Sequence, residues 1–496
     1  MVPLFMVIPL AAAFIIALTA KLDERVHDAC AVTGGFVIAA LSIAVCALLG
    51  RSGAPGVMTY RIGSLPPPAG IALVIDGLSS FMLVTVNLVG FLVTLYATGY
   101  VKCYTDRWKF YSLFFLMLSG INGVLLASDI FNLYVFMEIA AIAAYFLVAF
   151  GTEAEELEAS FKYAIMGSVA SAFILLGIAF LYGATSTLNM ADMARVLAAS
   201  NPARVIQLVS VLFIMGFGLK AALVPFHAWL AYAHSSAPAP VSAMLSGVLI
   251  KVLGIYALSR IFFNVFGMDT AIMQILIVIG VLSMAVGAIL AFGQSDIKRL
   301  FAYSTVSQIG YVAIGLGVAT PLAVFGALFH LFNHSIFKSL LFLNAGAIER
   351  LRGTRELGKL SGILADEPVT GYATLVSALS ISGIPPLGGF WSKAIIIFAC
   401  IQAGRPALAL IAALISILTL VYYFRSLSPV LFGPKAEMTA GARPTLAMNA
   451  AMAALAVLVA ASAFALLPAI KEVLLNGAIA VLTNGTANNV PLGAIQ

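Results

Sequence analysis

Apolar runs of 18 or more residues recur along the chain from its first residue to about position 467, separated by short polar or glycine- and proline-rich connections. A run of this length can cross the hydrocarbon core of a bilayer as a helix. Only 9% of the 496 residues are charged and 62% are hydrophobic, which is typical of a multi-pass membrane protein and not of a soluble core. We therefore predict an all-α polytopic membrane protein with about 14 transmembrane helices.

The connections between the apolar runs are short, so they offer no soluble domain that could hold a nucleotide, a flavin or a metal cluster. The four cysteines have no C-x-x-C spacing and lie in or beside apolar runs, which is unlike disulfide or iron–sulfur ligands. The sequence has no basic patch with interleaved aromatic residues, which is the pattern that would indicate nucleic-acid binding. We expect no cofactor, no metal and no nucleic-acid partner, and we interpret the first run, 1–20, as a retained helix because it lacks a cleavage site.

Basic residues are distributed unevenly between the two sides of the predicted bundle. The connections after odd-numbered runs hold fifteen of the 26 Lys and Arg residues, and those after even-numbered runs hold seven. Cytoplasmic connections carry the excess of positive charge, so both termini are predicted on the non-cytoplasmic side of the cell membrane. The four remaining basic residues are lysines inside apolar runs: Lys220, Lys251, Lys338 and Lys393.

A charged side chain at mid-membrane costs about 2.5–3.5 kcal/mol on insertion scales, so several of them indicate partners, water or function. Glu138 has no basic neighbour on its own run, and Lys220 is the best candidate for its partner; the alternative is a protonated carboxyl that satisfies a backbone group. Lys220 could instead extend to the membrane interface. Pro225 argues against this, because it frees backbone carbonyls and predicts an interrupted helix around a hydrated cavity.

Lys251 follows the turn "APAP" by about a dozen residues, which is about 18 Å at helical rise and therefore near mid-bilayer. Burial favours the neutral form of a lysine, whereas a nearby carboxylate favours the charged form. A movable Glu138–Lys220 pair is therefore predicted to switch the proton affinity of Lys251.

Three polar residues recur every four positions in "FHLFNHSIFKSLLFLNAG" and so share one helical face: His330, His334 and Lys338. A metal-ligand pair is one interpretation of the two histidines, but a proton-conducting line with a lysine fits the absence of a cysteine or carboxylate on that face better. His227 and His234 flank the turn after the seventh run and could act as caps, gates or proton acceptors at an inlet.

The apolar run at 370–403 is too long for one straight crossing, and "SGIPPLGGF" in its middle predicts a broken helix with Lys393 just after the break. Two interrupted helices, each with a lysine nearby, are typical of inverted-repeat transporters. The segment 187–201 has one polar face and predicts a short helix on the membrane surface. Asp296 is expected to cap a helix, and Asp76, Ser79 and Ser80 are either a cap or candidate sodium ligands.

Five segments together carry a family resemblance: "NLYVFMEIAAIAAY", "GLKAALVPFHAWLAYAHSSAPAPVSAMLSGVLIK", "DIKRLFAYSTVSQIGY", "LFNHSIFKSLLFLNAG" and "SGIPPLGGFWSK". Their content and order resemble the antiporter-like subunits shared by Mrp-type multisubunit cation/proton antiporters, respiratory complex I and membrane-bound hydrogenases. "LYGATSTLNMADMA" and "PPPAGIALVIDGLSS" resemble the Mrp D-type subunit most closely.

This resemblance implies a fold of fourteen helices with two inverted five-helix repeats that contain broken helices. It divides the chain into helices 1–3 at 1–108, a first repeat at 109–263, a second repeat at 264–430, and a C-terminal helix and tail at 431–496. A central polar axis is implied at Glu138, Lys220, Lys251, His330, His334, Lys338 and Lys393, with His227 and His234 nearer the inlet. The family fills the last position with lysine or glutamate, and this chain has lysine.

The resemblance implies a proton-translocating subunit of an Mrp-type Na⁺/H⁺ antiporter, with other membrane subunits, H⁺ and Na⁺ as its partners. The alternative is the proton-pumping subunit of a redox-driven complex, such as an NADH dehydrogenase or a membrane-bound hydrogenase. A scaffold without transport is disfavoured by the number of lysines inside apolar runs.

Overall fold

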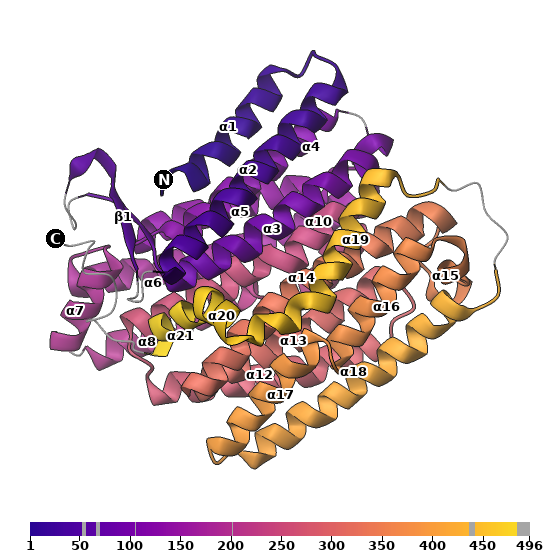
Figure 1. Ribbon diagram of the computed structural model, residues 1–496. Helices are drawn as coiled ribbons and strands as arrows, with labels where there is room; N and C mark the ends of the chain where they lie inside the picture. Colours follow the sequence, from indigo (N-terminus) through magenta and orange to yellow (C-terminus); the bar gives the residue numbers. More distant parts are fainter. Residues whose placement is uncertain (52–55, 66–69, 105, 201, 436–441, 484–496) are drawn as a thin grey trace.

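The computed structural model describes residues 1–51, 56–65, 70–104, 106–200, 202–435 and 442–483. Eleven helices in these ranges are long and apolar enough to cross a membrane. The bundle carries the N-terminus, β1 (Met58–Arg61) and α7 (Met190–Ser200) at one end and α15 (Ile363–Asp366) at the other (Figure 1). The chain is thus a multi-pass helical membrane protein, as predicted.

The elements up to the first helix break precede the buried centre of the chain. Besides β1 and α7 they are α1 (Leu4–Leu18), α2 (Glu24–Arg51), η1 (Ile62–Ser64), β2 (Ala72–Ile75), α3 (Gly77–Tyr100), η2 (Val101–Cys103), α4 (Arg107–Leu126), α5 (Ile130–Val148), α6 (Ala154–Thr185) and α8 (Ala203–Lys220).

The elements after that break include two long central helices and a second break. They are α9 (Ala228–Ser236), α10 (Ala239–Met244), η3 (Leu245–Leu249), η4 (Lys251–Tyr256), α11 (Ala257–Ser259), η5 (Arg260–Val265), α12 (Thr270–Phe292), α13 (Ile297–Val318), α14 (Pro321–Arg352), η6 (Leu357–Lys359), α16 (Pro368–Ser382), α17 (Gly388–Gln402), α18 (Pro406–Phe432), α19 (Leu446–Ala461), η7 (Ser462–Leu466), α20 (Pro468–Lys471), η8 (Glu472–Asn476) and α21 (Gly477–Thr483).

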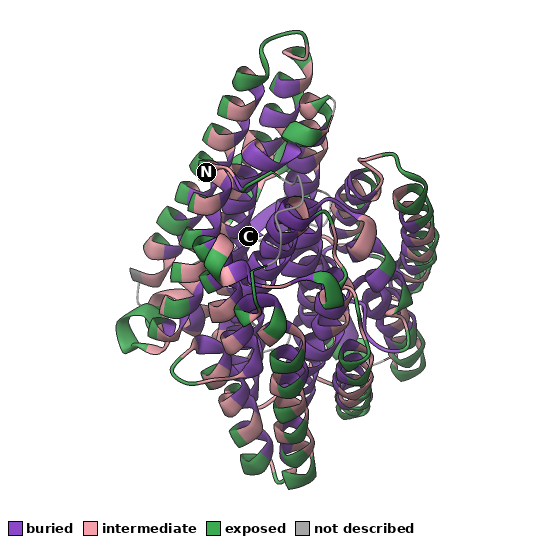
Figure 2. Cartoon of the chain, turned by 90° about the vertical axis from the view of Figure 1, so that its right-hand side faces the viewer, coloured by how far each residue is buried: buried purple, intermediate pink, exposed green. Residues whose placement is uncertain are grey.

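Buried residues gather along the middle of the bundle, and exposed residues lie on its outer helices (Figure 2). The segment Ala239–Val265, which joins α10 to η5 through several π-helical turns, is entirely buried, and α13 and α14 are nearly so. Outer helices such as α6 and α18 expose large apolar side chains, including Phe161 and Phe424. A bilayer or partner subunits would cover these faces.

Both predicted helix breaks are present. The long run at 370–403 is divided into α16 and α17, and α8 ends at Lys220 while α9 begins only at Ala228. Prolines at 225, 385 and 386 lack the backbone donor that a continuous helix needs, which explains both interruptions. The predicted short amphipathic helix is α7, whose apolar side chains are buried on one face.

Two elements correct the all-α prediction and its boundaries. The strands β1 and β2 form an antiparallel hairpin in which Met58 pairs with Ile75, so the third apolar run begins as a strand and not as a helix. A short apolar run fits a buried strand and a helix start equally well, so periodicity could not separate them. The described part of the predicted tail is helical to Thr483, and α21 packs against α3. Residues 66–69 of the D-type segment and residues 484–496 of the tail lie outside the described residues.

Candidate functional site

The predicted contact between Glu138 and Lys220 is present. Lys220 is the last residue of α8, and its Nζ donates a hydrogen bond of 3.3 Å to Oε1 of Glu138 on α5. Ser171 of α6 donates to the same oxygen at 2.5 Å. Lys220 is buried, with 4% of its side chain exposed, whereas Glu138 is 24% exposed. The pair therefore connects the interior of the bundle with its outer face.

The helix break beside Lys220 is held by side chains of neighbouring elements. Ser283 of α12 accepts a hydrogen bond from the backbone N–H of Val224, and the indole N–H of Trp229 donates to the carbonyl of Leu219 at 3.0 Å. An unpaired buried N–H is costly, so the Ser283 contact satisfies the N–H of Val224, while the Leu219 carbonyl also accepts from the backbone N–H of Ala222 at 3.1 Å. These contacts keep the ammonium of Lys220 at a fixed position next to α5.

Lys251 lies in the π-helical part of the central segment and is completely buried. Its Nζ donates to the carbonyls of Ser246 at 2.5 Å and Gly247 at 2.7 Å, within the same segment. The Ser246 hydroxyl in turn shares a hydrogen bond of 2.7 Å with Thr305 of α13. No carboxylate of the described residues lies within ion-pair distance of Lys251, so backbone carbonyls alone stabilise its ammonium.

The three residues at four-residue spacing all lie buried on α14. His330 Nδ1 lies 2.9 Å from the hydroxyl of Ser392 on α17, and Lys338 donates to the carbonyl of Phe301 at 2.6 Å. Neither ring nitrogen of His334 has a hydrogen-bond partner among the described residues. Because an unpaired buried polar group is costly, water is expected beside His334.

Lys393 follows the second helix break and uses a backbone group that the break sets free. Its Nζ donates to the carbonyl of Ile381 at 2.6 Å and lies 3.4 Å from the hydroxyl of Ser416 on α18. It also lies over the ring of Tyr311, 5.1 Å from the ring centre, and this ring is 5.7 Å from that of His330. The ring of Tyr311 therefore lies between Lys393 and His330.

The two inlet candidates occupy different environments. His234 near the end of α9 is completely buried, its ring is stacked on Phe342, and neither ring nitrogen has a partner among the described residues. The ammonium groups of Lys338, Lys251 and Lys298 act on it through space. His227 precedes α9 and is half-buried. The structure brings His234 close to the central lysines and leaves His227 at the break.

Sequence reasoning missed the polar residues that connect the predicted ones. Tyr423 of α18 lies 3.3 Å from Lys338 Nζ and 3.0 Å from the Ser304 hydroxyl. Lys298 of α13 is buried and forms an ion pair of 2.7 Å with Glu349 of α14. Isolated tyrosines and serines in apolar helices carry no pattern that distinguishes them from ordinary packing residues, so only their tertiary contacts identify them.

The contacts of Asp76 support its role as a helix cap and do not support a role as a sodium ligand. Asp76 caps α3 in a reciprocal arrangement with Ser79, and both its oxygens accept hydrogen bonds from Arg260, at 2.5 and 2.6 Å. Arg260 also donates to the hydroxyl of Tyr256 at 3.0 Å. A cation at Asp76 would have to displace the Arg260 guanidinium, whose side chain is only 12% exposed. Asp296 likewise caps α13, as predicted.

Asp76→Asn is expected to lower the free energy of unfolding by about 3–5 kcal/mol, because it leaves the largely buried guanidinium of Arg260 without its counter-charge. The apparent melting temperature of the detergent-solubilised chain measures this loss. Asp192→Asn, which removes the partner of the exposed Arg195, is the matched control and should change the melting temperature little. Equal shifts for the two variants would contradict the importance of the Asp76–Arg260 pair.

The fold and the buried line of lysines and histidines define an ion-translocating type of membrane protein. Residues 127–419 match the family described as "NADH:quinone oxidoreductase/Mrp antiporter, TM", and residues 62–111 match "NADH-Ubiquinone oxidoreductase (complex I), chain 5 N-terminus". The chain belongs to this NADH:quinone oxidoreductase/Mrp antiporter family.

Relatives named as antiporter subunits and relatives named as NADH-quinone oxidoreductase subunits are both similar to this chain over most of its length. The D-type subunit of the Na⁺/H⁺ antiporter of Alkalihalophilus pseudofirmus is 34% identical, over 84% of each sequence. The N-type subunit of the NADH-quinone oxidoreductase of Desulforudis audaxviator is 38% identical, over 85% of this chain and 84% of the relative. Among solved structures, a chain of the Mrp complex from Dietzia sp. DQ12-45-1b has a TM-score of 0.90 at 27% identity, over 100% of this chain and 99% of the other. A chain of the archaeal membrane-bound sulfane sulfur reductase has the same TM-score at 30% identity, over 99% of both.

Proposed function

We propose that this chain is the proton-translocating membrane subunit of an Mrp-type Na⁺/H⁺ antiporter composed of several membrane subunits. The observation that carries the proposal is the series of buried basic groups that begins at the Glu138–Lys220 pair and ends at Lys393. Relatives named as D-type antiporter subunits in several species, and the full-length match to a chain of an Mrp complex, support the antiporter assignment. Sodium is carried elsewhere in the assembly.

The proposed route for protons follows the order of these groups. Protons enter near His227 and His234, and breaking or forming the Glu138–Lys220 contact changes the electrostatic potential at Lys251. Protons then pass to His334 and His330, with Lys338 beside them, and reach Lys393 across Ser392 and Tyr311. The unpartnered nitrogens of His234 and His334 support this route, because they can accept protons directly or through water.

A fourteen-helix topology with two inverted repeats accommodates this route. Eleven crossings are the long apolar helices, and the others are α1, α14 and the broken pair of α16 and α17. The two repeats occupy 109–263 and 264–430, between the N-terminal helices at 1–108 and the C-terminal part at 431–496. The corresponding breaks after α8 and α16 support the repeats. Both termini lie on the non-cytoplasmic side of the cell membrane.

A second function is favoured by two observations. The chain is 38% identical to an N-type subunit of an NADH-quinone oxidoreductase and matches the fold of a chain of a respiratory sulfur reductase along its whole length. The same proton route would then be driven by electron transfer in partner subunits.

The identity of the co-purifying subunits separates the two functions. We expect the tagged chain to bring down other membrane subunits, and vesicles with this complex to change their internal pH when a Na⁺ gradient is applied. A pH-sensitive dye inside the vesicles measures the response. Iron–sulfur or nickel proteins in the complex, together with no response to Na⁺, would replace the antiporter assignment with the redox-driven one.

A further inference from the structure

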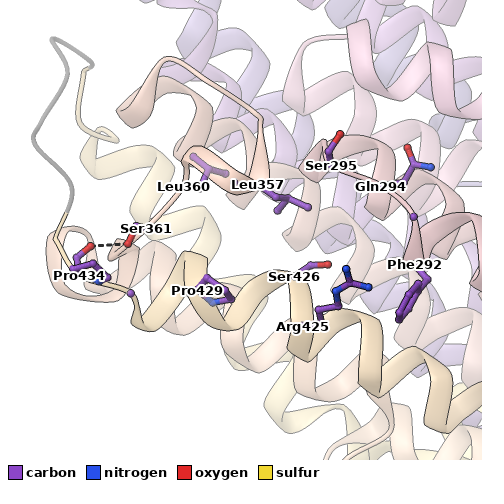
Figure 3. A pocket seen from close by; sticks show the side chains of 13 residues that line it. Phe292, Gln294, Ser295, Leu357, Leu360, Ser361, Arg425, Ser426, Pro429 and Pro434 are labelled. Carbon is purple, nitrogen blue, oxygen red and sulfur yellow. Dashed lines mark hydrogen bonds between the residues drawn. The ribbon is translucent and has the colours of Figure 1, made fainter.

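A cavity of about 810 Å³ lies at the end of the bundle that carries α15. It is formed where the end of α12, the segment that contains η6 and the end of α18 meet (Figure 3). None of the residues that line it belongs to the proposed proton route. In the proposed orientation this end is cytoplasmic, so the cavity lies at the level of the lipid headgroups.

The cavity is positively charged. Arg425 of α18 points into it, with the guanidinium 4.7 Å from the centre of the Phe292 ring (Figure 3). No Asp or Glu is among the residues that line the cavity, and no carboxylate of the described residues lies within ion-pair distance of Arg425. Other arginines near this end have such partners: Arg352 pairs with Asp366, Arg355 with Asp296 and Arg443 with Glu367. Arg425 therefore has its charge available for an anion.

Neutral polar groups surround this arginine. Ser295 and Gln294 lie across the cavity from α18, and Ser426 is next to Arg425 in the chain (Figure 3). The Gln294 side-chain amide already donates to the carbonyl of Leu290 at 2.9 Å. The serine hydroxyls and the guanidinium are the donor types that bind phosphate oxygens. The arginine fork matches two oxygens of one phosphate group.

The cavity continues into a surface that faces hydrocarbon. The helices α12 and α18 pack against each other, and both expose apolar side chains along their outer faces. Close to the cavity these are Ile289, with 63% of its surface exposed, Val421 with 46% and Phe424 with 70%. A ligand with a phosphate group and acyl chains would contact both regions at once.

We propose that this cavity binds the headgroup of an anionic phospholipid. Arg425 forms a bidentate contact with the phosphodiester, the Ser295 and Ser426 hydroxyls complete the headgroup site, and the acyl chains lie along α12 and α18. This lipid anchors the end of α18, the helix that supplies Tyr423 and Ser416 to Lys338 and Lys393. The binding site itself does not depend on the transport function.

Native mass spectrometry of the full-length chain with its co-purified subunits tests the proposal. After delipidation, the complex is titrated with phosphatidylglycerol. We expect Arg425→Gln to need about five times more lipid to bind the first molecule, because a basic residue near the headgroups contributes about that factor in affinity. Arg425→Lys keeps the charge but loses the guanidinium fork, so its lipid affinity should lie between that of the unmodified complex and that of Arg425→Gln. Arg405→Gln removes an exposed arginine that contacts Gln274 and should bind like the unmodified chain.

Three results would overturn the proposal. Equal lipid binding by the unmodified complex and Arg425→Gln would show that the cavity is not the site. Full competition by millimolar inorganic phosphate, lost in Arg425→Gln, would assign the cavity to free phosphate. A cross-link from the Ser426→Cys variant to a neighbouring subunit, with no Arg425-dependent lipid in the complex, would identify a protein contact surface instead.

Discussion

Glu138→Gln is expected to reduce Na⁺-driven proton transport at least about tenfold while the complex still assembles. Glutamine has nearly the same size and can keep the contact with Ser171, but it removes the charge that stabilises the Lys220 ammonium. A buried ammonium without its partner is strongly destabilised, so Lys220 can no longer alternate between a paired and an unpaired state. The initial rate of dye fluorescence change in vesicles, after a Na⁺ gradient is applied, measures the effect.

Glu158→Gln on the adjacent α6 is the matched control for this variant. Glu158 forms an ion pair of 2.6 Å with Lys162 at the exposed start of α6, where solvent screens the interaction. The transport rate of the Glu158→Gln complex should equal that of the unmodified complex. Glu138→Asp, which keeps the charge on a shorter side chain, should retain more transport than Glu138→Gln. If Glu138→Gln kept more than half of the rate, the pair would not be the switch.

Lys251→Met is expected to abolish proton transport and to leave the fold intact. Methionine fills a similar volume, and the removal of the ammonium leaves only the carbonyls of Ser246 and Gly247 without this donor. Lys251 lies at the centre of the buried segment without a carboxylate partner among the described residues. Its replacement therefore interrupts the proposed route between the inlet and α14, and a gap in a proton route cannot be bypassed by local packing.

The same vesicle assay measures this effect, with size-exclusion chromatography to verify assembly. Lys162→Met is the control, because Lys162 is an exposed lysine paired with Glu158 and lies outside the proposed route. A complex with Lys251→Met that transports protons at the rate of this control would exclude Lys251 from the route. Loss of transport together with loss of assembly would show a structural role instead.

Local sequence signals predicted the parts of the fold that depend on short stretches of chain. The apolar runs predicted the long helices, because each run must satisfy its backbone hydrogen bonds internally in a bilayer. The prolines at 225, 385 and 386 predicted both helix breaks, and the four-residue spacing of His330, His334 and Lys338 predicted their common face on α14. The capping role of Asp296 followed from its position before an apolar run, and for Asp76 a cap was one of the two roles that the sequence left open.

Contacts between distant segments could not be predicted in this way. Asp76 and Arg260 are 184 positions apart and have no local pattern that pairs them. Lys338 and Tyr423 are 85 apart, and the packing of α21 on α3 joins opposite ends of the chain. Each of these contacts depends on which helix faces lie together, and hydrophobicity alone does not distinguish one apolar face from another.

The sequence by itself determined that this chain spans a membrane many times and places lysines, histidines and a glutamate inside apolar helices. A charged residue inside an apolar run is visible in the sequence, and the free-energy cost of placing that charge in the membrane makes it informative. The tertiary structure decided which partners these charges have: a carboxylate for Lys220, backbone carbonyls for Lys251, and a freed carbonyl at a helix break for Lys393. Partners of this kind arise from helix packing, because a buried ammonium must be satisfied by whatever groups the neighbouring helices bring within hydrogen-bond distance.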